Sequence, residues 1–261
     1  MDSKDARSYF SNDNSILSIT PSVIVYPRNE NDVRKATRFS WQLAERGRSL
    51  PITSRGSGTD QTGAAIGNGI IMVFPAHMNK IIELNTKSGE IAIEPGINFG
   101  KLQQSLNTHG LFIPPYPSSL EYSTIGGAIA NNSGGEKSVK YGDMRRYVKS
   151  LRVVLANGEI IDTKPLNKKE LSKKMGQSDF EGEIYRSLDS LIEENKELIS
   201  NTDLSVSRNG AGYDIRDVST KKGFDLTPLF VGSQGTLGII TEAILTTETH
   251  NTDTTLIFGF F

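Results

Sequence analysis

Hydrophobic and polar positions follow two different periods along the chain, which is typical of a mixed α and β protein. Short apolar runs predict strands at residues 22–26, 50–53, 69–74, 80–84 and 90–94. The last two of these runs enclose a turn and therefore predict a hairpin. Apolar residues at helical spacing predict a helix over residues 32–46, with Asn29 or Asn31 as its N-cap. A second helix is predicted from Asn98 to Gly110.

The second half of the chain continues this mixture. Asn157 and Gly158 lie between apolar runs at residues 151–155 and 159–161 and predict another hairpin. Residues 164–175 are rich in lysine and predict a surface helix or loop. A longer helix is predicted over residues 181–199. Its apolar face would hold Ile184, Leu188, Leu191, Ile192 and Leu198, with glutamates 193, 194 and 197 in solvent. The final apolar run, at residues 255–261, is interpreted as the first strand of a further domain.

Composition excludes several classes of function. The 261 residues include 29 basic and 30 acidic side chains, so no basic excess predicts a nucleic-acid partner. Cysteine is absent, which excludes disulfides, thiolate metal sites and cysteine nucleophiles. The three histidines are isolated in the sequence and predict no metal site. No apolar run approaches the ~18–20 residues that span a bilayer. We therefore expect a cytoplasmic protein without a transmembrane segment, with peripheral attachment at the inner membrane left open.

Glycine is enriched, and 15 of its 25 residues gather at 56–69, 126–142, 210–212 and 232–238. The first cluster follows a predicted strand, but Gly56, Gly58 and Gly63 give G-x-G-x-x-x-x-G, and no helix follows. The dinucleotide-binding fingerprint is therefore not met. Such a loop is either an ordinary turn or an anion-binding nest of N–H groups and hydroxyls. Neither a phosphate-binding P-loop nor a G-x-S-x-G nucleophile elbow occurs.

Two further segments, residues 124–135 and 232–238, carry no charge and have side chains too small to fill a core. In such segments either backbone packs on backbone or a flat ligand lies against the chain. Three loops of this kind predict a large, planar, phosphate-bearing cofactor rather than a small substrate.

These motifs, in this order, resemble the FAD-binding domain of the vanillyl-alcohol oxidase/p-cresol methylhydroxylase (PCMH-type) superfamily. Within it, the chain is most similar to the branch that includes glycolate oxidase, D-lactate dehydrogenase and D-2-hydroxyglutarate dehydrogenase. The likeness covers about residues 20–248. The matching motifs are RGSGT at 55–59, EPG at 94–96, TIGG at 124–127, NSGG at 132–135, KYG at 140–142, AGYD at 211–214 and LFVGSQGTLGIITE at 229–242.

The resemblance implies an α+β fold, the PCMH-type fold of two α+β subdomains with FAD between them. Residues 1–20 would be a lead-in, 21–76 the first subdomain with the pyrophosphate loop, 77–248 the second subdomain, and 249–261 the start of a cap domain. The cofactor-binding residues that it implies are Arg55, Gly56, Ser57, Gly58, Thr59, Asp60, Gly63, Ser119, Thr124, Ile125, Gly126, Gly127, Asn132, Gly134 and Ile240. The loop has no histidine or cysteine, so we expect FAD to be bound noncovalently.

The resemblance also implies a function, with two departures from the family pattern. Asp60 places a negative charge beside the pyrophosphate, and residues 163–225 form a longer, lysine-rich segment. The implied function is a flavoprotein oxidoreductase that transfers a hydride from a 2-hydroxy acid, such as D-lactate or glycolate, to flavin N5. The electron acceptor is unknown, and no residue is assigned as general base. The alternatives are a FAD-binding module that is inactive without its cap domain or a partner chain, and an enzyme similar to UDP-N-acetylenolpyruvoylglucosamine reductase.

Overall fold

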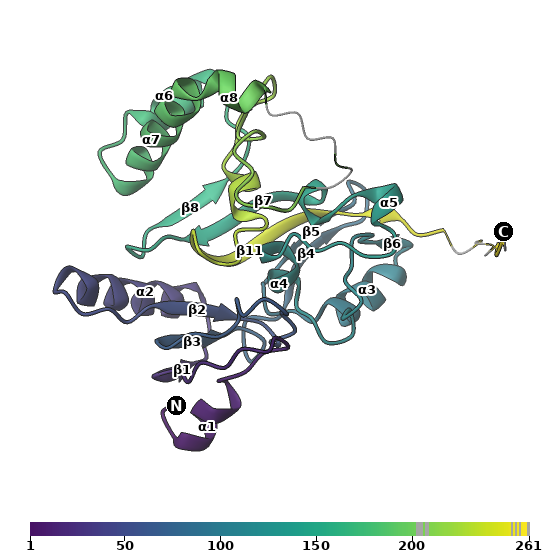
Figure 1. Cartoon of the computed structure of the whole chain (residues 1–261). Helices are drawn as coiled ribbons and strands as arrows, with labels where there is room; N and C mark the ends of the chain where they lie inside the picture. The colour runs from purple at the N-terminus through teal and green to yellow at the C-terminus, as the bar shows by residue number, and fades with distance from the viewer. Residues whose placement is uncertain (202–205, 207–208, 252, 254, 256, 260–261) are drawn as a thin grey trace.

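A computed structural model describes residues 1–201, 206, 209–251, 253, 255 and 257–259. A small parallel sheet contains β1 (Val23–Val25), β3 (Ile70–Val73) and β2 (Ile52–Arg55), in this order (Figure 1). Helix α2 (Glu30–Glu45) connects β1 to β2. Its N-cap is Asn29, whose side chain accepts a hydrogen bond from the Asp32 N–H. All four residues of β3 are buried, as expected for a central parallel strand that is covered on both faces.

A larger antiparallel sheet has the order β4 (Ile81–Asn85), β5 (Glu90–Ile93), β11 (Ile239–Thr246), β7 (Val148–Val154) and β8 (Ile160–Thr163). Both predicted hairpins are confirmed, with Gly89 and Gly158 at positive φ in the turns. Helices α3 (Phe99–Asn107) and α4 (Ile125–Ala130) bury Phe99, Ile125 and Ile129 in the main core of this sheet.

The remaining described elements are short or peripheral. They are α1 (Lys4–Tyr9), β6 (Leu111–Phe112), α5 (Ser138–Tyr141), the 3-10 helix Met144–Arg146, α6 (Lys168–Met175), α7 (Phe180–Glu194), α8 (Lys196–Asn201), β9 (Ser219–Thr220), β10 (Gly223–Phe224), α9 (Thr227–Phe230) and β12 (Glu248–Thr249).

The two sheets share a second core and a charged network. Met72, Phe74 and Val33 of the first half pack with Val154 and Ile239 of the second. Beside this core, Arg152 Nε donates to the Glu30 carboxylate at 2.6 Å, and the Thr241 hydroxyl donates to the same carboxylate at 3.1 Å. These contacts join α2 to strands β7 and β11 of the antiparallel sheet.

The predicted helix over residues 181–199 is divided into α7 and α8 at Asn195. The buried stripe of α7 includes Glu181, Tyr185 and Ile192, and Glu181 is neutralised by Lys174 at 2.6 Å. Leu191 lies at the edge of this stripe and is 44% exposed, so the predicted apolar face was wrong at that position. Leu198 lies beyond the break and is 70% exposed, so it too was wrongly placed on the face.

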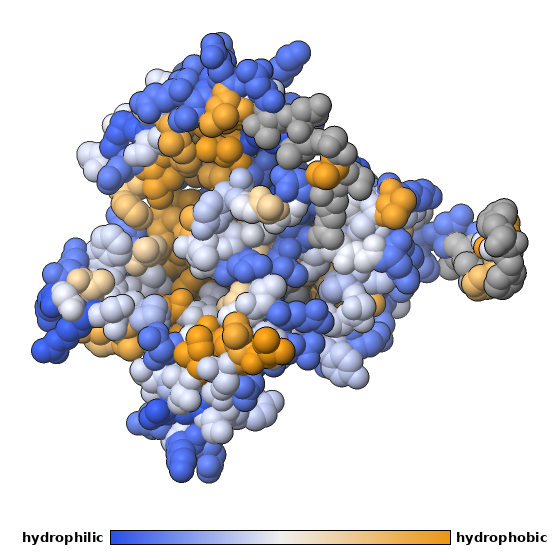
Figure 2. All heavy atoms as spheres, viewed as in Figure 1, coloured by the Kyte–Doolittle hydropathy of each residue, from blue (hydrophilic) through white to orange (hydrophobic). Residues whose placement is uncertain are grey.

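Two surface features complete the description. Trp41 of α2 contacts Phe180 of α7, with ring centroids 5.9 Å apart, and apolar surface is visible between α2 and the helices α6 and α7 in Figure 2. At the other end of the chain, β12 pairs with β6, and the His250 N–H donates to the Gly110 carbonyl. The predicted strand at residues 255–261 lies partly outside the described residues, which exclude 256, 260 and 261.

Candidate functional site

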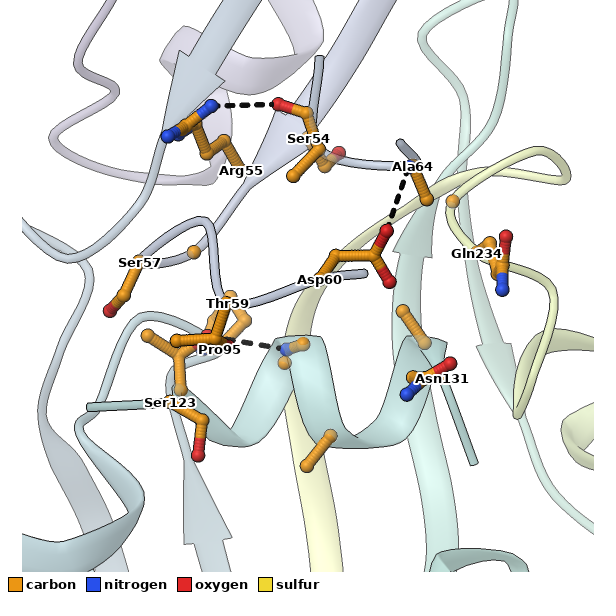
Figure 3. Close-up of a pocket in the computed structure, with 18 of the residues that line it drawn as sticks. Ser54, Arg55, Ser57, Thr59, Asp60, Ala64, Pro95, Ser123, Asn131 and Gln234 are labelled. Carbon is orange, nitrogen blue, oxygen red and sulfur yellow. Dashed lines mark hydrogen bonds between the residues drawn. The ribbon is translucent and has the colours of Figure 1, made fainter. Parts of the chain in front are cut away.

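A cleft lies between the glycine loop after β2, helix α4 and the loop before β11 (Figure 3). Its empty volume is about 1030 Å³, part of which is open to solvent. Glycine, alanine, serine and threonine form most of the lining, so the backbone itself makes much of the wall. The fold therefore brings together the three small-residue segments that the sequence analysis identified.

The glycine loop begins directly where β2 ends at Arg55. Gly58 has a φ of +76°, a conformation that favours glycine. A Cβ atom on Gly56 would lie 2.2 Å from Thr124 Oγ1, so glycine is needed for the loop to approach α4. No group among the described residues accepts a hydrogen bond from the N–H of Gly56, Ser57, Gly58 or Thr59. A run of N–H groups without acceptors fits an anionic ligand.

Arg55 contributes a buried positive charge to this loop. Arg55 is 6% exposed, and its Nη1 donates a hydrogen bond to the Ala65 carbonyl at 3.1 Å. No carboxylate of the described residues forms an ion pair with it. Burial lowers the pKa of the guanidinium from its ordinary value, although Asp13 and Tyr9 oppose that change. An anion in the loop would favour the charged form of Arg55. Both the N–H groups of residues 56–59 and the Arg55 guanidinium are therefore suited to an anionic ligand.

Asp60 lies in the same loop, but its carboxylate is engaged by the loop itself. Oδ2 accepts hydrogen bonds from the Thr62 N–H, the Thr62 hydroxyl and the Ala64 N–H, all at 2.8–2.9 Å. Burial by itself raises the pKa of Asp60, but these bonds outweigh burial and leave the pKa below its ordinary value. The negative charge that departs from the family pattern therefore serves to close the turn at residues 60–64.

Helix α4 forms the opposite wall, although glycines make it a poor helix by composition. The Thr124 side chain caps it by accepting a hydrogen bond from the Gly127 N–H. The Gly126 N–H donates to the Pro95 carbonyl at 2.8 Å, and a Cβ on Gly126 would lie 2.6 Å from Pro95 Cβ. Tertiary contact with Pro95 thus fixes the helix in place and requires glycine at position 126.

The third wall is the loop at residues 233–238, which is attached to the end of α4. The Gln234 N–H donates to the Ala130 carbonyl at 2.8 Å, and Gln234 has a φ of +53°. Two buried hydroxyls in the cleft lining, Ser54 Oγ and Ser123 Oγ, have no hydrogen-bond partner among the described residues. Buried hydroxyls without partners in the wall of a cleft are consistent with a polar ligand that bonds to them.

The structure places most of the sequence-predicted site residues in this cleft, and four of them elsewhere. Those in the lining are Arg55, Gly56, Ser57, Gly58, Thr59, Asp60, Ser119, Thr124, Gly126, Gly127 and Ile240. Gly63 instead lies against Leu17, and Ile125 is fully buried in the main core. Asn132 is 1% exposed and bonds through its side chain to Asp143 and the Arg145 N–H, and Gly134 does not line the cleft.

Sequence reasoning missed part of the lining. Ser54, Pro95, Ser123, Asn131 and Gln234 also face the cleft. A signal was present for each of them, because each directly precedes, follows or lies within a motif that the sequence analysis identified. The motifs were identified by their glycines, whereas the polar side chains of Ser54, Ser123, Asn131 and Gln234 lie beside or between those glycines and contribute hydroxyls and amides to the lining.

Comparison with known proteins now identifies the class that this fold and cleft define. Residues 21–164 match the family described as "FAD binding domain". The chain belongs to this family, and its cofactor is FAD. The glycine loop and α4 both lie within the matched residues, while the loop at residues 233–238 lies after them.

Similar curated proteins are dehydrogenases and oxidases of 2-hydroxy acids by name. The chain is 38% identical to D-2-hydroxyglutarate dehydrogenase of Escherichia coli over 92% of its length, which is 24% of that protein. It is 34% identical to the GlcD protein of the glycolate oxidase of Bacillus subtilis over 86% of its length and 36% of that protein. It is 29% identical to D-lactate dehydrogenase of Archaeoglobus fulgidus, covering 85% of this chain and 38% of that protein. The chain thus spans between about a quarter and two fifths of these relatives.

A solved structure supports the fold alone. Alkyldihydroxyacetonephosphate synthase superposes with a TM-score of 0.63 and 22% identity, over 95% of this chain and 37% of that one. This confirms the predicted mixed fold of the FAD-binding type. No helix within the described residues is both long and apolar enough to cross a membrane.

Proposed function

We propose that FAD binds noncovalently in the cleft and that the chain is the FAD-binding portion of an enzyme that oxidises a 2-hydroxy acid. The observation that carries the location of FAD is the glycine loop, in which the N–H groups of residues 56–59 have no acceptor among the described residues and lie beside the buried charge of Arg55. The relatives named for D-2-hydroxyglutarate, glycolate and D-lactate support the substrate class.

In this proposal the residues have separate roles. Arg55 and the N–H groups of residues 56–59 hold the pyrophosphate, while Ser119 and residues 124–127 line the ribityl chain and the isoalloxazine. Ile240 contacts the adenine. The small side chains of α4 leave a flat wall, and the hydroxyls of Ser54 and Ser123 supply hydrogen bonds to the polar parts of the ligand.

When bound, FAD supplies the hydride acceptor for oxidation of an alcohol carbon. The cleft of this chain supplies binding and orientation. Its lining contains two ionisable side chains among the described residues, Arg55 and Asp60. Arg55 bonds to the Ala65 carbonyl, and Asp60 is held by its own loop. We therefore assign no proton transfer to these residues.

The location and attachment of FAD are tested first. The chain is reconstituted with FAD, separated from free flavin and precipitated with acid. All flavin is expected in the supernatant, because the glycine loop carries no histidine or cysteine. Flavin that remains with the pellet would show a covalent link, and a chain that retains no flavin would contradict binding in this cleft.

The substrate class is tested by turnover with an artificial electron acceptor. D-2-hydroxyglutarate, D-lactate and glycolate are compared with their L-enantiomers, where these exist, and with a primary alcohol. The assay uses this chain and a form extended to the length of the relatives. We expect the extended form to oxidise one of the D-2-hydroxy acids. Flavin binding without turnover of any 2-hydroxy acid by either form would leave the binding module as the correct description.

A further inference from the structure

Residues 10–19 lie against the glycine loop. After α1, residues 11–19 form a small hairpin in which Asn12 bridges Ser18 and the Ile19 N–H donates to the Ser11 carbonyl at 2.8 Å. The Asp13 carboxylate accepts a hydrogen bond from the Ser15 N–H at 2.9 Å and so supports the hairpin tip. None of these residues lines the cleft, so they reach the loop from outside it.

Three contacts connect this segment to the loop. The Arg55 guanidinium carbon lies 5.2 Å from the centroid of the Phe10 ring, which is within the range of a cation–π interaction. The Asn14 N–H donates to the Asp60 carbonyl at 3.0 Å. Leu17 lies so close to Gly63 that a Cβ there would be 2.7 Å from Leu17 Cδ1. The segment thus touches both the beginning and the end of the loop.

The contact with Phe10 bears directly on the position of the Arg55 charge. A Cβ on Gly58 would lie 2.3 Å from Arg55 Nη2, so the guanidinium lies directly against the loop backbone at Gly58. Phe10 itself packs with Ile24, Ile71 and Val73 of the parallel sheet. The ring is therefore anchored to the sheet and limits where the guanidinium can move.

We infer that residues 10–19, here named the N-terminal clasp, are a positioning element of the FAD site that holds Arg55 and the glycine loop ready for the pyrophosphate. This inference rests on the proposed location of FAD. Preorganisation of this kind increases affinity because the loop and the long arginine side chain lose less freedom when the ligand binds. Burial of Arg55, which lowers its pKa, also strengthens the cation–π interaction with Phe10, because such interactions are stronger where the cation is desolvated.

Phe10→Leu is the main test, because leucine preserves the apolar packing and removes the ring. Loss of the ring removes the cation–π contact that limits where the guanidinium can move, so FAD affinity should fall about 3- to 10-fold. Phe39→Leu is the matched control, because Phe39 is 52% exposed on α2 and does not line the cleft. Flavin fluorescence titration of the full chain measures both, and the control should bind as wild type does.

A second pair of variants tests the hairpin. Leu17→Ala should weaken FAD binding about 2- to 5-fold and increase hydrogen exchange at residues 60–64 in the FAD-free protein. Ile16→Ala, at a fully exposed neighbouring position, should change neither measurement. This pair keeps the inference testable even if Phe10→Leu folds poorly.

A readout specific to the pyrophosphate separates positioning from general damage. Phe10→Leu should weaken ADP and FAD to a similar extent and leave riboflavin, which lacks the pyrophosphate, unchanged. Equal losses for FAD and riboflavin would contradict a positioning role. Unchanged FAD affinity in Phe10→Leu and Leu17→Ala would also contradict it, provided that Gly58→Val loses at least ~10-fold. If Gly58→Val also binds normally, the proposed FAD site itself is wrong.

Discussion

Adjacent glycines in α4 offer a test that separates packing from ligand binding. Gly126 and Gly127 are neighbours in sequence and occupy the same short helix. A Cβ on Gly126 would lie 2.6 Å from Pro95 Cβ and 2.8 Å from the Pro95 carbonyl oxygen, so either α4 or the Pro95 backbone must shift. A Cβ on Gly127 would meet only Thr124 Oγ1, at 3.3 Å, and Gly127 is exposed toward the cleft.

The magnitudes follow from these distances. Replacing glycine with alanine in a helix gains about 1 kcal/mol in propensity. Overpacking in a tightly packed region costs about 1–3 kcal/mol, so the net effect of Gly126→Ala should be to lower the free energy of unfolding by up to about 2 kcal/mol. Gly127→Ala requires only a small shift of the Thr124 hydroxyl, so the free energy of unfolding should stay within about 1 kcal/mol of wild type. Its methyl group occupies ligand space, and FAD affinity should fall at least ~10-fold.

Urea unfolding of the FAD-free chain measures the first effect, and fluorescence titration of FAD measures the second. The expected pattern is a destabilised Gly126→Ala protein and a stable Gly127→Ala protein that binds FAD weakly. Two results would refute the reasoning. One is a Gly127→Ala protein that is less stable than Gly126→Ala, and the other is wild-type FAD affinity in a folded Gly127→Ala protein.

Three further predictions concern polar groups around the site. The folded pKa of Asp60 lies below its unfolded value, so the stability that Asp60 contributes is present above the unfolded value and is lost as pH falls. Urea unfolding should therefore show a difference in the free energy of unfolding between wild type and Asp60→Asn. This difference should be constant from about pH 5 to 8 and should narrow below about pH 4. Ser123→Ala removes a buried hydroxyl that has no partner among the described residues, so thermal unfolding should show unchanged or slightly greater stability. Titration of the same variant should show about a 2- to 5-fold loss of FAD affinity. Arg152→Met leaves the Glu30 carboxylate without its cation, and urea unfolding should show a loss of about 1 kcal/mol, with FAD affinity nearly unchanged because Arg152 does not line the cleft.

Local sequence signals were sufficient for the elements that depend on local chemistry. The hairpin turn at Gly158 was predictable because it needs a residue at positive φ, and the start of α3 was predictable because the Asn98 side chain caps it. The end of α7 was not predictable, because helical periodicity continues through Asn195. The glycine loop was identified as an anion-binding candidate from its composition alone.

Helix α4 shows what local signals do not contain. The sequence IGGAIA has two glycines in six residues and a low helix propensity, and the sequence analysis predicted no helix there. The helix forms because Ile125 and Ile129 are fully buried and because Gly126 bonds to Pro95, which lies far earlier in the chain. The same tertiary requirement explains the glycines, since close approach to Pro95 and an open cleft both exclude larger side chains. Composition thus indicated a ligand-binding segment at residues 124–135, but not that a helix forms one wall of the cleft there.

The position of the cleft has a consequence for stability. Its glycine loop follows a strand of the parallel sheet, whereas α4 and the loop at residues 233–238 belong to the antiparallel half. Gly56 and Thr124 meet where these halves join. A ligand that contacts both walls binds only when the two halves are assembled, so its binding free energy adds to the free energy that holds them together. At about one hundred times its dissociation constant, FAD would add about 2.7 kcal/mol to the free energy of unfolding. Saturating FAD should therefore raise the stability of wild type but add much less to Gly127→Ala, whose halves pack equally well around a cleft that FAD fills poorly.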